Sequence, residues 1–401
     1  MPAQPNRFDK HARKVLALVW VVALIAGVAL LEWMLTPGGG RHRSSAHSAG
    51  PSPARHIVMR EWRRDTDYTF PTSEARRQFG DGSVPASYAL SVDSAGFIEP
   101  ARRHEKPDIT LAFLGGSTTE CALVLPQNRF PDLAARKLEA ALGLKVNGLN
   151  AGMSGNNSMH ALALLVGKVL PQRPDFVVLM EAVNDVGVLS AHGSYWVRQG
   201  SLRFVVNERQ SVSEAGRLLT ASLIPYTTEL VQNAWRRMGG WFGMRPAYAE
   251  VLPLRPPSAA PSSDRRKTAA RAYESSLKSF VHTVSAWGAT PVLMTQVNVE
   301  PRTETERRST FLDRKQLAKV VDRPEDFASM HDHFNAILRA VAKSEGTILI
   351  DLAAAHPWAF SDVYDAIHFT DRGSQRVAEI IAAALQDPVA ERAKTAAKAR
   401  P

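Results

Sequence analysis

Short apolar runs alternate with longer amphipathic stretches along most of the chain after residue 108. The apolar runs cover residues 109–114, 145–149, 176–180, 291–296 and 347–352. The stretches with helical periodicity cover residues 131–142, 158–170, 265–287, 324–344 and 374–385. Nearly continuous apolar strands that alternate with helices are typical of a parallel sheet covered on both faces. We therefore predict an α/β protein, a three-layer α/β/α fold with a five-stranded parallel sheet, whose ligands bind beyond the carboxyl ends of the strands.

Two segments depart from this alternation. Before the first helix and strand, Tyr88, Leu90 and Val92 alternate with polar residues, which predicts a short strand and turn. Residues 186–263 separate the third and fourth strands, and this insert ends in a proline-rich stretch. An interval of this length is usually a lid, a subdomain or a disordered segment. The main domain is therefore predicted to span residues 84–387, with the insert inside it.

A membrane anchor is predicted near the amino terminus. Residues 15–36 are apolar except for Glu32, and at about 1.5 Å per residue they measure roughly 33 Å, enough to span the hydrocarbon core. The basic segment 1–14 precedes them, and Trp20 and Trp33 lie where indole rings prefer the membrane interface. This pattern places the amino terminus in the cytoplasm, although Arg41 and Arg43 beyond the span weaken the charge asymmetry.

Two other interpretations of this apolar segment are disfavoured. A cleavable signal peptide has a shorter apolar region and a small-residue cleavage site, and a buried core helix has a polar face. We therefore expect a single-pass protein of the inner cell membrane, with a tether or extension at 37–83 and a periplasmic main domain. The basic segment 388–401 is expected to be a solvated, fraying tail.

Composition excludes several classes of site. The 401 residues include one cysteine, Cys121, so neither a disulfide framework nor a site with several thiolate ligands can form. His331 and His333 are two positions apart in a predicted helix and point in different directions, so no metal site is expected. The formal net charge of +10 favours anionic surfaces but does not distinguish nucleic acid from phospholipid.

Residues that can carry chemistry follow the predicted strands. Ser117 lies on a glycine-rich turn after the first strand, a position that suits a nucleophile. The loop containing Gly155 and the segment containing Asn184 follow the next two strands and can donate amide hydrogens to an oxyanion. Near the carboxyl terminus, Asp365 precedes His368 by three residues, a spacing that lets the carboxylate orient the imidazole.

Together these four blocks resemble the SGNH branch of the GDSL-type hydrolases, in the same order along the chain. The resemblance covers residues 108–385 apart from the insert, and it implies a serine esterase that uses no metal or cofactor. By this resemblance Ser117 is the nucleophile and His368 is the base that Asp365 orients. The backbone amides of Ser117 and Gly155 and the side chain of Asn184 are the implied oxyanion hole.

The sequence departs from the family pattern at two positions. Gly116 stands where an aspartate usually precedes the serine, and Ala182 stands where a glycine usually precedes the asparagine by two residues. If position 182 requires a positive φ, alanine is poorly tolerated there and Asn184 is expected to be shifted. Gln296 and Asn298 leave the fourth strand and are candidate substrate-binding residues, or else they cap the neighbouring loop.

Two further residues near the predicted mouth of the sheet are not expected to react. Ser154 lacks the surroundings of a nucleophile elbow, so we interpret it as a loop hydroxyl. Cys121 is expected to be a small buried residue on the helix after Ser117.

The combination of anchor and triad predicts a membrane-anchored esterase that removes short acyl groups, such as O-acetyl, from an envelope glycan through an acyl-serine intermediate. Lipid esters are the other substrate class. An O-acyltransferase that passes the acyl group to a glycan would use the same triad, and a catalytically silent glycan-binding scaffold is a further alternative. Nucleic-acid binding is disfavoured because the basic residues are dispersed. Residues 223–244 suit either a helix lying on an anionic membrane or a lid over the site.

Overall fold

The structure is a computed structural model that describes residues 56–57, 59–72, 85–195, 206–207, 262–299 and 327–399. All of these residues belong to one unit, Pro53–Pro401. Several predicted features lie outside the described residues: the anchor at 15–36, most of the insert, and its amphipathic stretch at 223–244. Within the described residues, no helix is both long enough and apolar enough to cross a membrane.

Five parallel strands form the central sheet, in the spatial order β5-β4-β6-β8-β9. Their bounds are β4 Ile109–Gly115, β5 Val146–Asn150, β6 Phe176–Met180, β8 Thr290–Met294 and β9 Ile348–Ile350. In the register, Ala112 of β4 lies opposite Leu149 of β5 and Val177 of β6. All residues of β5 and β6 are buried, which explains the continuous apolar character of β6, whereas β5 buries Asn147 and Asn150 as well. The predicted five-stranded parallel sheet is confirmed.

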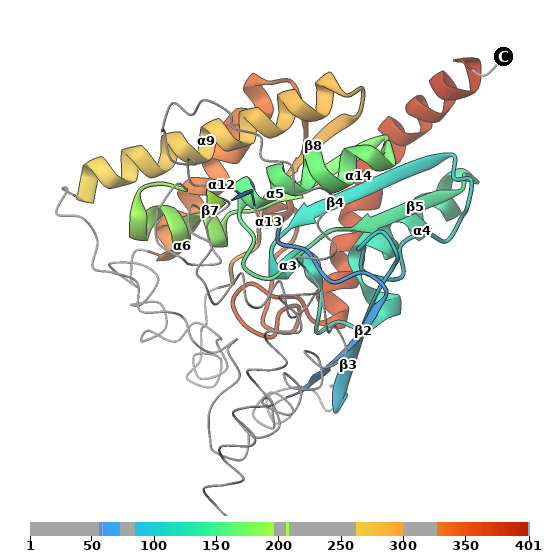
Figure 1. The fold of residues 1–401 in the computed structure, drawn as a ribbon, viewed down its shortest axis with the longest axis horizontal. Coiled ribbons are helices and arrows are strands. Elements are labelled where there is room, and N and C mark those ends of the chain that lie inside the picture. Colours follow the sequence, from blue (N-terminus) through green and yellow to red (C-terminus); the bar gives the residue numbers. More distant parts are fainter. Residues whose placement is uncertain are drawn as a thin grey trace, which may run out of the picture. The chain divides into compact units, whose positions relative to one another are not determined.

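Helices cover both faces of the sheet, as Figure 1 shows. One face carries α5 Ser158–Leu164, α6 Val183–His192, α9 Ser262–Ala286 and α12 Phe327–Ser344. The other face carries α4 Phe130–Leu142 and α14 Asp371–Ala399. Because strand side chains alternate between faces, Val177 packs into the first helical layer and Val178 into the second. The predicted three-layer α/β/α arrangement is confirmed.

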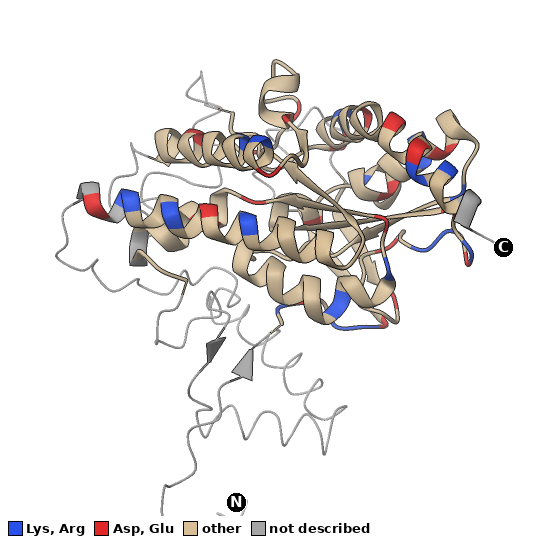
Figure 2. Ribbon diagram, turned by 90° about the horizontal axis from the view of Figure 1, so that it is seen from above, with Lys and Arg blue, Asp and Glu red and all other residues tan. Residues whose placement is uncertain are grey.

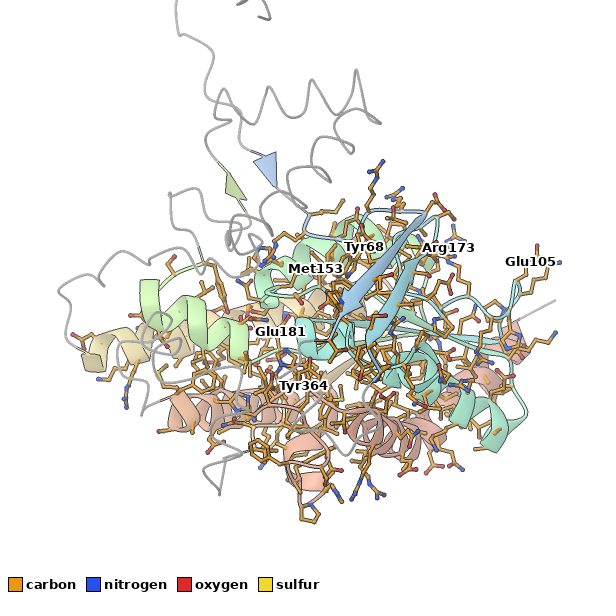
Figure 3. All side chains as sticks on the ribbon, turned by 90° about the horizontal axis from the view of Figure 1, so that it is seen from below. Tyr68, Glu105, Met153, Arg173, Glu181 and Tyr364 are labelled. Carbon is orange, nitrogen blue, oxygen red and sulfur yellow. The ribbon has the colours of Figure 1, made fainter. Side chains whose placement is uncertain are left out.

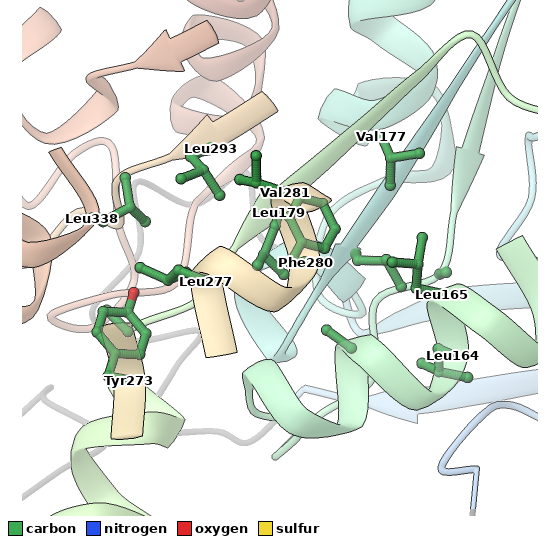
Figure 4. Packing of buried hydrophobic residues seen from close by; sticks show 14 of the residues in the cluster. Leu164, Leu165, Val177, Leu179, Tyr273, Leu277, Phe280, Val281, Leu293 and Leu338 are labelled. Carbon is green, nitrogen blue, oxygen red and sulfur yellow. The ribbon is translucent and has the colours of Figure 1, made fainter. Parts of the chain in front are cut away.

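The packing of α9 illustrates how sequence periodicity builds the first layer. Its residues at three- and four-residue spacing are fully buried, namely Tyr273, Leu277, Phe280 and Val284. Figure 4 shows Leu277 and Phe280 packed against Leu179 and Leu293 of the sheet. Fully burying an apolar side chain of this size contributes about 1.5–3 kcal/mol to folding, so this helix face is a main source of stability.

The described residues also form two antiparallel strand pairs. They are β2 Thr66–Pro71 with β3 Ser87–Val92, and β1 His56–Ile57 with β7 Val206–Asn207. In β3, Tyr88, Leu90 and Val92 are buried in alternation, which confirms the predicted strand. The remaining elements are α3 Ser117–Glu120, α13 Leu352–Ala355, the 3₁₀ turns Pro126–Asn128 and Leu170–Gln172, and the π-helical turn Leu165–Val169.

Residues 59–72 pack onto the domain, although they lie in the predicted tether or extension at 37–83. β2 pairs with β3 along its whole length, and Trp62 is 7% exposed in a small cluster with Leu90 and Ile98. The rings of Tyr68 and Phe70 contact the Trp62 ring, with centroids 4.7 Å and 5.9 Å away. The folded domain therefore begins before residue 84, and the segment 59–62 before β2 is called the arm below.

The carboxyl-terminal helix also differs from the prediction. α14 continues to Ala399, although residues 388–401 are predicted to be a fraying tail. Pro388 lacks a backbone N–H and normally ends a helix, which is why the sequence suggests a boundary there. Packing prevails, because Val389 is fully buried and Arg392 pairs with Asp175 at 3.2 Å. The prediction of a fraying tail is therefore wrong for the described residues up to 399, although Glu391, Lys394 and Thr395 are exposed to solvent.

Charged residues of the described part lie mainly on the outer surfaces of the helices (Figure 2). Blue and red positions are interspersed there, and no helix shows a continuous basic stripe. Many of the cations have acidic partners nearby, such as Arg103 with Asp132 at 2.9 Å and Lys278 with Glu274 at 2.7 Å. The described surface therefore does not concentrate the net positive charge in one place.

Candidate active site

The ends of three neighbouring strands bring the predicted blocks together. Because β5, β4 and β6 are parallel and adjacent, the segments that follow them meet at one edge of the sheet. Figure 3 marks this edge with Met153, Glu181 and Tyr364, and marks the opposite edge with Glu105 and Arg173. The site is therefore built from residues distant in sequence but adjacent in the fold.

Ser117, His368 and Asp365 form one hydrogen-bonded chain. The Nε2 atom of His368 lies 2.7 Å from Oγ of Ser117, and its Nδ1 atom lies 2.7 Å from Oδ2 of Asp365. Because the carboxylate accepts a hydrogen bond from the Nδ1–H group, the imidazole presents its acceptor nitrogen, Nε2, to the serine hydroxyl. Ser117 is the first residue of α3, where the chain turns sharply after β4.

The surroundings of Asp365 keep it ionised and in place. Its Oδ1 accepts hydrogen bonds from the backbone N–H groups of Ile367 and His368, at 2.9 Å and 2.8 Å. Burial would raise the pKa of Asp365, but the His368 ring and these hydrogen bonds outweigh it, so the pKa lies below 3.8. Tyr364 stacks on the imidazole with centroids 5.4 Å apart and rings within 5° of parallel. These contacts orient the ring before any substrate arrives.

Gly155 lies on the loop after β5, and the backbone conformation at this position requires glycine. Its φ is +77°, a backbone conformation that residues other than glycine rarely adopt. A Cβ at this position would also approach the guanidinium of Arg60 to 3.3 Å. The loop runs alongside the end of β4, because the Met153 N–H donates to the carbonyl of Gly115 at 3.1 Å. Gly155 therefore lies beside the turn that carries Ser117.

Asn184 lies at the start of α6, with its side-chain amide beside the same turn. Its Nδ2 donates to the carbonyl of Asn156 at 2.6 Å. An amide nitrogen carries two hydrogens, and the Asn184 side chain also acts as a hydrogen-bond donor towards the Glu181 carboxyl, so an oxyanion would share this donor. A Cβ on Gly116 would lie only 2.3 Å from this Nδ2, so any side chain at position 116 would displace the Asn184 amide.

Ala182 does not displace Asn184. The sequence raises the possibility that position 182 needs a positive φ, but its φ is −161°, outside the left-handed region that favours glycine. Ala182 is fully buried against the first helical layer. Position 182 therefore does not require the positive φ that would conflict with alanine in place of glycine.

Gln296 and Asn298 play different parts. The Gln296 side chain donates to the Thr118 hydroxyl at 2.7 Å and accepts from the Val183 N–H at 2.9 Å, so it links neighbouring loops. This arrangement corresponds to the capping alternative for Gln296. Asn298 is half-buried and lines a cavity of about 470 Å³ with Trp358 and Arg339. None of the three triad residues lines this cavity.

Cys121 is buried but lies outside the helix that the sequence predicts for it. α3 ends at Glu120, and Cys121 follows in a left-handed conformation with φ 55°. Burial raises the pKa of its thiol to about 12, so the thiolate nucleophile is scarce at neutral pH.

Two residues of the site have no role in the sequence analysis. Glu120 is fully buried and accepts hydrogen bonds from both the N–H and the hydroxyl of Ser154. Arg60 of the arm donates to the carbonyl oxygens of Ser154 and Gly155, at 2.9 Å and 3.0 Å. Glu120 belongs to the same motif as Ser117, but Arg60 is 95 residues before Gly155, and no local pattern connects them.

Three carboxyl groups beside the site have raised pKa values. Burial raises the pKa of Glu120 to about 7 and that of Asp185 to about 6, although hydrogen bonds from Ser154 and Ser158 respectively oppose the rise. Burial and the nearby Asp185 raise the pKa of Glu181 well above 4.5. The site therefore contains carboxyl groups that hold a proton near neutral pH.

Histidines outside the site show no arrangement for a metal. His331 is fully buried, and burial lowers its pKa to about 4, whereas His333 is exposed. Within the described residues, no group of three or more His, Cys, Asp or Glu side chains could hold a metal ion.

No family model matches the sequence, and no curated protein matches it. Several solved structures are similar at 16% identity, each over 70% of this chain. A lipase/acylhydrolase from Enterococcus faecalis matches over 96% of its length with a TM-score of 0.39. The α/β hydrolase LAE5 from the metagenome of Lake Arreo and the acetylxylan esterase Axe2 from Geobacillus stearothermophilus match over 94%, with TM-scores of 0.37 and 0.36. Likeness at this level does not transfer an activity.

Proposed function

We propose that this chain is a serine ester hydrolase of the SGNH/GDSL type. The observation that carries the proposal is the chain from Asp365 through His368 to Ser117, with both contacts at 2.7 Å. An oriented imidazole next to a serine hydroxyl is the arrangement that activates a nucleophile. A silent scaffold has no need for this geometry, so a catalytic role explains it better.

The residues perform acyl transfer in two steps. Ser117 Oγ attacks the ester carbonyl while His368 Nε2 takes its proton, and the imidazolium then protonates the departing alcohol. The resulting acyl-serine is attacked by water, with His368 again acting as the base. During both steps the carbonyl oxygen becomes negative, and the N–H groups of Ser117, Gly155 and Asn184 can donate to it.

The substrate class follows from the surroundings of Ser117 and from the predicted location. The sequence near Ser117 contains no long apolar run that suggests a deep acyl tunnel. We therefore favour a short acyl ester, such as O-acetyl, on an envelope glycan over a lipid ester. Transfer of the acyl group to a glycan would use the same triad.

The location is part of the proposal. Residues 15–36 would anchor the protein in the inner membrane and leave the catalytic domain in the periplasm. Protease added to spheroplasts should then cleave the domain from intact membranes. A domain that is protected until the membrane is dissolved would contradict this orientation.

Substitution of the nucleophile tests the function. Ser117→Ala should abolish hydrolysis of a small aryl acetate, because no other hydroxyl takes the place of Oγ. Ser279→Ala on the exposed side of α9 is the matched control and should retain the parental rate. If the folded Ser117→Ala protein hydrolyses the ester at the parental rate, the proposal is wrong.

Acetylated glycans then test the substrate class. The protein is mixed with an acetylated polysaccharide, and released acetate is measured with and without a non-acetylated glycan as acceptor. Acetate release that depends on Ser117 supports a deacetylase, whereas faster acetylation of the acceptor supports the transferase. Turnover of lipid esters alone would reject the glycan.

A further inference from the structure

The arm before β2 contacts the loop that contains Gly155. Arg60 donates from Nη1 to the Gly155 carbonyl and from Nη2 to the Ser154 carbonyl, at 3.0 Å and 2.9 Å. Its own backbone carbonyl accepts from the Asn156 side chain at 3.1 Å. Glu61, the next residue, pairs with the buried Lys168 at 3.1 Å. The arm is thus held in place independently of its guanidinium contacts.

The backbone groups of the loop have partners, with one exception. The Ser154 N–H donates to Glu120 at 3.2 Å, and the Asn156 N–H donates to Met153 at 3.0 Å. The carbonyls of residues 154 and 155 accept from Arg60, and the Asn156 carbonyl accepts from Asn184. Among the backbone N–H and C=O groups of residues 154–156, the Gly155 N–H is the one without a hydrogen-bond partner in the described residues.

The geometry of the peptide bond links Arg60 to that N–H. The Ser154 carbonyl and the Gly155 N–H belong to the same planar, trans peptide group, so they point in opposite directions. When Nη2 of Arg60 holds this carbonyl, it also fixes the direction of the N–H on the other side. A cation on the carbonyl further polarises the peptide group and strengthens its N–H as a donor.

We propose that Arg60 is a positioning residue for the oxyanion hole, which makes the arm part of the active site. The proposal rests on the esterase function proposed above. Arg60 touches no reacting atom in this scheme and acts through the Gly155 peptide. Because one guanidinium holds two consecutive carbonyls, a lysine with a single point charge cannot replace it fully.

Kinetics of full-length variants test the proposal. Arg60→Ala should lower kcat on the aryl acetate by about 10- to 10³-fold with KM within about threefold, because the donor acts mainly in the transition state. Arg60→Lys should lie between this variant and the parent. Arg64→Ala, which changes an exposed arginine four residues later, is the matched control and should keep the parental kcat.

Chemical rescue separates positioning from general stabilisation. Millimolar guanidinium chloride, well below denaturing concentrations, should restore part of the kcat of Arg60→Ala and leave Ser117→Ala inactive. Parental kcat in Arg60→Ala overturns the proposal. A loss of kcat that guanidinium does not restore also overturns it. The same holds if the loss of kcat equals the unfolded fraction of the variant measured by circular dichroism. If hydrolysis by the parent does not depend on Ser117, the esterase function itself fails, and the role of Arg60 fails with it.

Discussion

The side-chain amide of Gln296 donates a hydrogen bond to the hydroxyl of Thr118 at 2.7 Å. Thr118 directly follows Ser117, and the same glutamine accepts from the Val183 N–H, directly before Asn184. Gln296 is 2% exposed and its backbone is held by Asn335 on both sides. The glutamine therefore fixes the distance between the proposed nucleophile and the proposed oxyanion donor.

Replacing Gln296 by leucine should affect both activity and stability. The Thr118 hydroxyl and the Val183 N–H lose their partner, and each unsatisfied buried group costs about 1–3 kcal/mol. A small displacement of Ser117 relative to Asn184 should lower kcat by about 10- to 100-fold. Aryl acetate kinetics and urea denaturation measure the two effects. Gln375→Leu at an exposed position of α14 is the control, and parental kcat in Gln296→Leu would contradict the positioning role.

The sheet and the blocks at its strand ends are predictable because both depend on local patterns. Apolar runs mark the buried strands, and parallel strands bring their carboxyl ends to one edge, so Ser117 and Asn184 are expected to meet. Three-residue spacing likewise connects Asp365 with His368. For these residues the expected proximity agrees with the structure, whereas their catalytic roles remain a proposal.

Contacts between segments distant in sequence are not predictable in this way. Arg60 lies in the segment for which a tether or extension is predicted, and its contact with Gly155 joins residues 95 positions apart. The helix beyond Pro388 likewise depends on burial of Val389 rather than on propensity. In both cases tertiary packing overrides the local signal, which by itself indicates a tether or a tail.

Replacing Asn184 by aspartate tests the proposed oxyanion hole without changing the shape of the side chain. The carboxylate cannot donate a hydrogen bond, so the developing negative charge loses one partner and meets a like charge. Loss of one such donor typically costs about 10²- to 10³-fold in kcat, and KM should change little. Steady-state kinetics measure the loss, and circular dichroism shows that the fold persists, since the variant also loses the hydrogen bond to the Asn156 carbonyl and should be less stable. A parental kcat would remove Asn184 from the oxyanion hole.

Gly116 should not tolerate even one carbon atom. In Gly116→Ala the new Cβ would approach Asn184 Nδ2 to 2.3 Å and the Asn156 carbonyl to 3.2 Å, so the Asn184 side chain must move. We expect kcat to fall at least tenfold, and the larger, charged side chain in Gly116→Asp should lower it further. Gly143→Ala is the matched control, because nothing lies within 4 Å of its Cβ and only its φ of +68° is strained. It should lose stability but keep kcat; equal kcat in all three variants would show that Asn184 is not displaced.

Glu120 should make the protein less stable as the pH rises towards neutrality. Its pKa is raised from 4.5 to about 7 by burial, so between these values the folded state holds a proton that the unfolded chain has released. Stability therefore falls with increasing pH across this window, by about 3 kcal/mol in total. Glu120→Gln removes the titration while keeping the size of the side chain.

Urea denaturation of the parent and of Glu120→Gln, from about pH 4 to about pH 8, isolates this contribution. Asp185 and His331 titrate in both proteins, so their contributions cancel in the difference. The variant should gain about 3 kcal/mol relative to the parent between the two ends of the range. Glu105→Gln at an exposed position is the control, and its difference from the parent should stay within about 0.5 kcal/mol. A difference between Glu120→Gln and the parent that does not vary with pH would mean that Glu120 stays ionised in the folded protein, held so by Ser154.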